Sequence, residues 1–87
     1  MAKSELREAV SANVVRLLRE ERKRLGISME ALAERAGLSQ SIISLIERDL
    51  RNPTLDTLLR IADVLEVELA KILAEAKRAA VAGKRKR

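Results

Sequence analysis

The sequence predicts an all-α fold, a compact bundle of five helices. Apolar residues recur every three or four positions along most of the chain, as they do on one face of a helix. There is no run of alternating β-branched residues, which would be typical of a strand. Only one proline and three glycines interrupt the 87 residues, so the helices are expected to be joined by short connections.

The first helix is expected from about Ser4 to Leu25. Ser4 is a candidate N-cap, because its hydroxyl can accept a hydrogen bond from a free backbone N–H of the first turn. Gly26 is expected to end the helix, since glycine adopts the left-handed conformation without strain. The apolar face of this helix is formed by Leu6, Val10, Val14, Leu17, Leu18 and Leu25.

Two short helices follow, one over Met29–Ala36 and the other from Gln40 to about Arg48. Ser28 and Ser39 are their candidate N-caps. A turn of three residues that contains Gly37 separates them, which is how a helix-turn-helix is built. The residues expected to face inward are Leu32, Ala33 and Ala36 on the first helix and Ile43 and Ile46 on the second.

Pro53 and Thr54 predict the start of a fourth helix, and a fifth follows after a break that neither glycine nor proline marks. The fourth has its apolar stripe at Leu55, Leu58, Leu59, Ala62 and Leu65. The fifth has its stripe at Leu69, Ile72, Leu73, Ala76 and Ala80. This last stripe either closes the core of the monomer or continues across a two-fold axis. The second alternative predicts a dimer interface at Leu69, Ile72, Leu73 and Ala76.

The composition excludes several classes of function. The chain has no cysteine, histidine or aromatic residue, so we expect no metal, no cofactor and no base-stacking platform. No serine lies in a nucleophile turn, and an enzyme is not expected. The sequence shows neither a signal peptide nor a membrane span, which predicts a soluble cytoplasmic protein that does not bind a membrane. No small-molecule ligand is expected either. Four of the 18 basic residues form a flexible tail at 84–87, which follows a single domain at 1–83.

The outer face of the helix at 40–48 points to DNA. Opposite its buried side lie Ser41, Ser44, Leu45 and Arg48. Gln40 stands at the helix start, and glutamine can bind adenine in the major groove through two hydrogen bonds. Ser28 and Ser39 are candidate phosphate anchors, because helix N-termini attract anions. A polar cluster suited to the sugar-phosphate strand follows at Arg48, Arg51 and Asn52. Outside such a motif, these residues would form an ordinary exposed polar face.

Three stretches resemble a known family: LREERKRLGIS (18–28), ALAERAGLSQSIISLIER (31–48) and RNPTLDTLLRIADVLEVEL (51–69). They are similar to the lambda-repressor-like helix-turn-helix DNA-binding domain, also called the Cro/CI or XRE type. The resemblance implies a sequence-specific transcriptional regulator that binds double-stranded DNA. It also implies a homodimer on a palindromic operator, acting as a repressor. Compact phage repressors and restriction–modification controller proteins are of this build.

The resemblance further implies a role for individual residues. The recognition helix at 40–48, within a helix-turn-helix at 28–48, would face bases with Gln40, Ser41 and Leu45. The positions implied on the phosphate side are Ser28, Ser39, Ser44, Arg48, Arg51 and Asn52. Arg22 and Glu47 match a family pair that forms an internal ion pair and stabilises the recognition helix.

The chain departs from the family pattern in several places. Leu45 stands where a polar side chain often contacts a base, so it is expected to contact a thymine methyl group instead. Asp49 and Glu66 stand where glycine is frequent, and Leu50 stands where lysine is frequent. Apolar residues around the motif favour an alternative function, an antitoxin-like or accessory module that binds another protein through the same surface.

Overall fold

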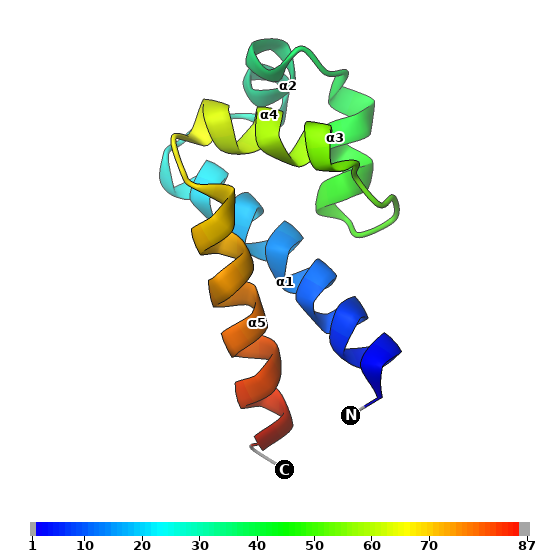
Figure 1. Cartoon of the computed structure of the whole chain (residues 1–87). Helices are drawn as coiled ribbons and strands as arrows, with labels where there is room; N and C mark the ends of the chain where they lie inside the picture. Colours follow the sequence, from blue (N-terminus) through cyan, green and yellow to red (C-terminus); the bar gives the residue numbers. More distant parts are fainter. Residues whose placement is uncertain (1, 86–87) are drawn as a thin grey trace.

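The structure, a computed structural model, describes residues 2–85, and this part of the chain consists of five α-helices and no strand. The helices are α1 (Lys3–Arg24), α2 (Met29–Ala36), α3 (Gln40–Glu47), α4 (Leu55–Leu65) and α5 (Leu69–Arg85) (Figure 1). The predicted all-α fold is therefore confirmed. The tail predicted at 84–87 begins within the last turn of α5, and its positions 86 and 87 lie outside the described residues.

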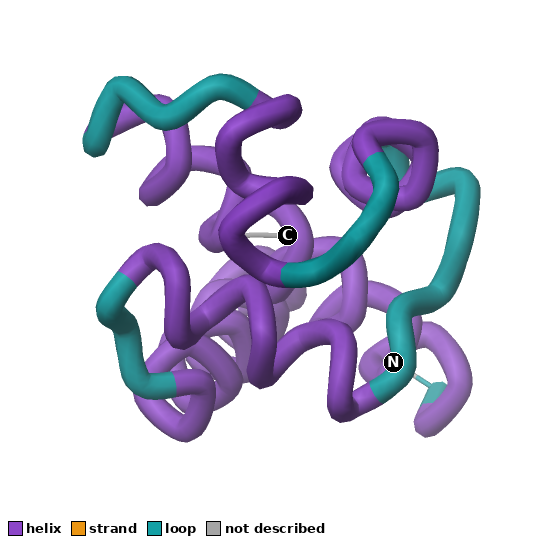
Figure 2. Tube along the Cα trace, turned by 90° about the horizontal axis from the view of Figure 1, so that it is seen from above, coloured by secondary structure: helices purple, strands orange, loops and turns teal. Residues whose placement is uncertain are grey.

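The two longest helices lie beside each other and run in opposite directions (Figure 1). The three shorter helices α2, α3 and α4 gather at the end of this pair where α1 ends and α5 begins. Figure 2 shows the same helices from above, with short loops joining their ends. The start of α1 at Lys3 and the end of α5 at Arg85 therefore lie together at the opposite end of the molecule.

Two predicted N-caps, Ser28 and Ser39, are confirmed, and Thr54 caps the helix whose start the sequence predicts at Pro53 and Thr54. The hydroxyl oxygens of Ser28, Ser39 and Thr54 each accept a hydrogen bond from the backbone N–H three residues later, at 3.0, 3.2 and 3.1 Å. Gly37 ends α2 in the left-handed conformation, with φ of 72°. The starts of α2, α3 and α4 and the end of α2 therefore follow from local chemistry that the sequence makes visible.

The predicted start of α1 is wrong. The helix begins at Lys3, with Ala2 rather than Ser4 at the N-cap position. The backbone N–H of Ala2 donates to Oε1 of Glu5 at 2.9 Å. A glutamate at the third helical position thus satisfies the free amide, and no serine cap is needed. At the other end Leu25, predicted to lie on the apolar face, is 42% exposed.

The hydrophobic core draws on all five helices. It is formed by Val14, Val15, Leu18, Leu32, Ala33, Ile43, Ile46, Ile61, Ala62, Leu65, Leu69, Ile72 and Ala76. The inward faces predicted for α2 and α3 are confirmed. On α4 the predicted stripe is partly wrong, since Leu55 and Leu59 are 64% and 46% exposed and Ile61 is buried instead. Contacts with α1 and α2 select the face of α4 that carries Ile61.

The two residues other than glycine with positive φ, Asp49 and Glu66, lie where glycine is frequent in the family that the sequence resembles. Glu66 has φ of 57° and ends α4, and the N–H of Val67 then donates to the carbonyl of Ala62 at 3.1 Å. Asp49 has φ of 58° after α3, where the N–H of Leu50 donates to Leu45 at 2.9 Å. Both helices thus end in the turn that glycine usually makes, although neither has a glycine there.

Among residues 2–85, no helix combines the length and apolarity that crossing a bilayer requires.

Candidate nucleic-acid interface

The turn between α2 and α3 is tightly specified. The backbone N–H of Leu38 donates to the carbonyl of Ala33 at 2.8 Å, and the side chain of Leu38 packs against the core. A Cβ atom on residue 37 would lie 3.1 Å from Nη1 of Arg60. The φ of Gly37 is 72°, a backbone conformation that is strained for residues with a Cβ. Glycine therefore suits this position both for its backbone conformation and for the space around it.

The outer face of α3 is held at the surface by a buried inner face. Ile43 and Ile46 are only 1% and 3% exposed, so the helix cannot rotate without losing core contacts. The residues predicted to face bases all retain accessible surface, with Gln40 and Ser41 exposed and Leu45 partly exposed. The helix presents these side chains from a fixed backbone.

The residues predicted to contact phosphates surround this helix. Ser28 and Ser39 lie at the N-termini of α2 and α3, and each hydroxyl keeps its hydrogen free to donate although its oxygen accepts the cap bond. Arg48, Arg51 and Asn52 are exposed in the segment after α3. Neither arginine forms a salt bridge with another described side chain. Ser44, on the same helix as the base-facing residues, is partly exposed.

An ion pair fixes the C-terminal end of α3. Nε and Nη2 of Arg22 donate to the two carboxylate oxygens of Glu47 at 2.7 and 2.9 Å. Nη1 of Arg22 donates to the carbonyl of Ile27 at 2.7 Å. Arg19 lies at the edge of the pair, with Nε 3.9 Å from Glu47 Oε1. The guanidinium of Arg22 thus joins α1, the segment before α2 and the end of α3.

One residue of this region was not identified from the sequence. Arg60 on α4 donates through Nε to Oδ2 of Asp56 at 2.8 Å and through Nη1 to the carbonyl of Ala36 at 3.3 Å. The spacing of Asp56 and Arg60 predicts a pair on one helix face. Nothing in the sequence predicts the second contact, because it depends on how α4 crosses α2.

The predicted dimer residues divide into two groups. Leu69, Ile72 and Ala76 are buried and belong to the monomer core, and the carbonyl of Ala76 accepts a hydrogen bond from Nδ2 of Asn13 at 3.1 Å. The apolar stripe of α5 thus closes the monomer with these three residues. Leu73 differs, since it is 41% exposed.

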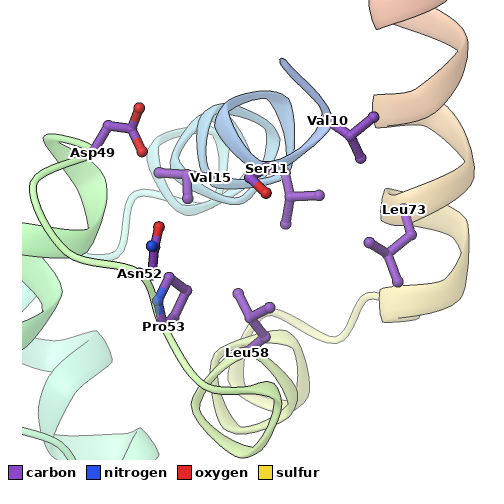
Figure 3. A pocket seen from close by; sticks show the side chains of 9 residues that line it. Val10, Ser11, Val15, Asp49, Asn52, Pro53, Leu58 and Leu73 are labelled. Carbon is purple, nitrogen blue, oxygen red and sulfur yellow. The ribbon is translucent and has the colours of Figure 1, made fainter. Parts of the chain in front are cut away.

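Leu73 borders a small cavity of about 160 Å³ between α1, α4, α5 and the segment after α3. In Figure 3 the side chains of Val10, Leu58 and Leu73 surround this space. The lining residues are Val10, Ser11, Val14, Val15, Asp49, Asn52, Pro53, Leu58 and Leu73. The surface beside the predicted phosphate cluster is therefore largely apolar.

A separate exposed ion pair lies at the end of α1. Nε of Arg24 donates to Oε2 of Glu21 at 3.0 Å. This hydrogen bond lowers the pKa of the Glu21 carboxyl and raises the pKa of the Arg24 guanidinium. Because both groups are open to solvent, the pair adds little to stability.

Comparisons with known proteins agree with this geometry. A family model described as Helix-turn-helix matches residues 18–72. The chain is 40% identical over 63 residues to an uncharacterized HTH-type transcriptional regulator of Sinorhizobium fredii, covering 72% of this chain and 77% of the relative. It is 39% identical over 61 residues to the immunity repressor protein of Bacillus phage phi105, and the match covers 70% of this chain and 40% of the phage protein.

The chain is also 39% identical over 59 residues to the HTH-type transcriptional regulator SinR of Bacillus subtilis, covering 67% of this chain and 53% of SinR. The match thus spans most of the rhizobial relative but less than two thirds of the phage repressor and of SinR. No solved structure matches the chain.

Proposed function

Because the chain belongs to the helix-turn-helix family of XRE type and is a transcriptional regulator with a DNA-binding domain, we propose that it acts as a repressor. In this proposal it binds a palindromic operator as a homodimer, in the cytoplasm, without a cofactor and without catalysis. The domain at 1–83 carries the function. The name of the phage relative, an immunity repressor, supports repression.

The observation that carries the proposal is the fixed outer face of α3. Ile43 and Ile46 anchor the helix in the core, and the Arg22–Glu47 pair holds its end. An α-helix fits the major groove, which is about 12 Å wide. In that position Gln40, Ser41 and Leu45 face base edges.

The phosphate contacts complete the interface. Ser28, Ser39 and Ser44 donate from α2 and α3, while Arg48, Arg51 and Asn52 hold the strand beyond α3. Contacts of this kind position the protein on the duplex, and the base contacts supply the specificity.

The homodimer places two recognition helices in successive major grooves, about 34 Å apart. Leu73 is the one predicted interface residue that remains exposed, and the apolar cavity beside it extends the available surface. We propose that this surface of α5, rather than the buried part of its stripe, faces the partner.

Selection of bound duplexes from a random pool tests the proposal. We expect a palindrome whose half-sites lie one helical turn apart. We also expect an affinity that falls steeply with salt: a plot of the logarithm of the binding constant against the logarithm of the salt concentration should have a slope of about −0.9 for each phosphate contact, and this slope is called the salt slope below. Selection of no sequence, or an affinity that does not depend on salt, would contradict it.

A second candidate is an antitoxin-like or accessory module that binds a protein through the same surface. Leu50, which is 64% exposed in the segment after α3, favours it. If this candidate is correct, Leu45→Ser will reduce binding of a co-purifying protein and leave DNA binding unchanged. If the repressor is correct, the same change will alter DNA binding.

A further inference from the structure

Arg60 links α4 to the helix-turn-helix. Its Nη1 donates to the carbonyl of Ala36, the last residue of α2, at 3.3 Å. Its Nε donates to Oδ2 of Asp56 on its own helix at 2.8 Å. The carboxylate of Asp56 thus orients the guanidinium, and the guanidinium reaches the point where α2 ends.

This carbonyl needs a partner from outside its own helix. The last four carbonyls of a helix have no helical donor. At the end of α2 the N–H groups of Gly37 and Leu38 donate to Glu34 and Ala33, at 3.3 and 2.8 Å. The carbonyl of Ala36 is left for Arg60, whose positive charge also suits the negative end of the helix dipole.

The other end of α2 is held in a similar way. Nη1 of Arg22 donates to the carbonyl of Ile27, directly before the N-cap residue Ser28, at 2.7 Å. Each arginine comes from a helix outside the motif, and each is oriented by a carboxylate, Glu47 for Arg22 and Asp56 for Arg60. The first helix of the motif is therefore fixed at both ends.

We propose that Arg60 is a positioning residue for DNA binding: by holding the end of α2 at the Gly37 turn, it sets the direction in which α3 leaves α2. The proposal rests on the function proposed above. The close fit at the turn supports it, since Nη1 of Arg60 lies 3.1 Å from the point that a Cβ of Gly37 would occupy. The guanidinium thus lies against the backbone that must turn.

The test compares Arg60→Gln and Arg60→Lys with Arg78→Gln, which removes an equal charge from the exposed surface of α5. The Kd for a selected duplex is measured over a range of salt concentrations, at a temperature where circular dichroism shows every variant folded. Hydrogen exchange of the Leu38 amide is measured without DNA, because this amide reports on the turn itself.

We expect Arg60→Gln to weaken DNA binding about fivefold, with an unchanged salt slope, because part of the binding free energy is then used to order the turn that Arg60 no longer holds. Exchange of the Leu38 amide is expected to become faster. Arg60→Lys should restore part of the affinity, because lysine keeps the charge but cannot bind Asp56 and Ala36 together through a planar fork. The Arg78→Gln control should bind within about twofold of the unaltered protein.

Equal affinities for Arg60→Gln and Arg78→Gln would overturn the proposal, as would unchanged exchange at Leu38. If the salt slope of Arg60→Gln were smaller by about 0.9, Arg60 would contact a phosphate directly, and the proposal that it only positions α3 would be wrong. If the unaltered protein selects no duplex, the proposed function itself fails. The exchange measurement separates that result from a failure of the Arg60 contact.

Discussion

Arg22 of α1 and Glu47, the last residue of α3, form an ion pair with two hydrogen bonds, at 2.7 and 2.9 Å. Arg22 is buried, with 9% of its surface exposed, and the side chain of Glu47 is 10% exposed. Removing either group would leave the other charge buried without its hydrogen-bonded partner, and only Arg19, 3.9 Å away, would remain near Glu47. The end of α3 therefore depends on a residue of α1.

The first prediction concerns this pair. Arg22→Met should lower the free energy of unfolding by about 3 kcal/mol, because it removes both hydrogen bonds to the Glu47 carboxylate, leaves only the more distant Arg19 beside it, and deprives the Ile27 carbonyl of its donor. Urea unfolding followed by circular dichroism measures the change.

Two further variants serve as its controls. Arg16→Gln breaks the exposed Arg16–Glu20 pair and should change stability by at most about 0.5 kcal/mol. The double variant Arg22→Met/Glu47→Leu should lose less than the sum of the single changes. A fully additive loss would contradict the coupling of the two residues.

The second prediction concerns base recognition. Gln40→Ala should weaken binding to the selected operator by about 1–3 kcal/mol and relax the preference at one base pair, because a bidentate contact to one base is lost. Fluorescence anisotropy on operators with single base changes measures both effects. Ser4→Ala, an exposed change in α1, is the control, and a uniform loss across all operators would exclude base contact by Gln40.

The third prediction separates phosphate contacts from base contacts. Arg48→Gln and Arg51→Gln should each weaken binding to all sequences alike and reduce the salt slope by about 0.9. A titration with salt measures the slope for each variant. Arg78→Gln on α5 should leave the slope unchanged, and an unchanged slope in Arg48→Gln would remove this residue from the interface.

Local signals in the sequence sufficed for the helix-turn-helix. Ser28 and Ser39 cap their helices with hydroxyls that bind three residues away, and the turn between the helices needs glycine at position 37 for its backbone conformation. Such features depend on neighbours in the chain, so the sequence predicts them directly.

Features that depend on packing were predicted less well. On α4 the apolar residues cover more than one face, and spacing alone favoured Leu55 and Leu59 over Ile61. Which face is buried depends on the crossing of α4 with α1 and α2. The contact of Arg60 with Ala36 escaped prediction for the same reason, since it joins residues 24 positions apart. The predicted base and phosphate contacts stay predictions.

The fourth prediction follows from the left-handed residue at the end of α4. Glu66→Gly should raise the free energy of unfolding by about 1 kcal/mol, because φ of 57° strains any residue with a Cβ. Urea unfolding measures the gain. Asp63→Gly, within α4, should instead destabilise by up to about 1 kcal/mol, since glycine there only adds freedom to the unfolded chain. A loss in Glu66→Gly would mean that the glutamate side chain contributes more than the strain removes.

The fifth prediction concerns assembly. Leu73→Glu should shift the proposed dimer towards monomer, because it places a charge in the apolar surface beside the cavity. Sedimentation equilibrium measures the association, and circular dichroism checks that the helices are retained. Ala79→Glu adds the same charge at another exposed position of α5 and should leave association unchanged. If both variants associate like the unaltered protein, the partner surface lies elsewhere.

The helix ends at Lys3 and Arg85 lie at the opposite end of the molecule from α2 and α3 (Figure 1). A fluorescent label or a tether to a sensor chip can therefore be attached at that end without obstructing the recognition helix. The molecule would then be immobilised with its duplex-binding side towards the solution, which suits real-time measurement of association and dissociation rates.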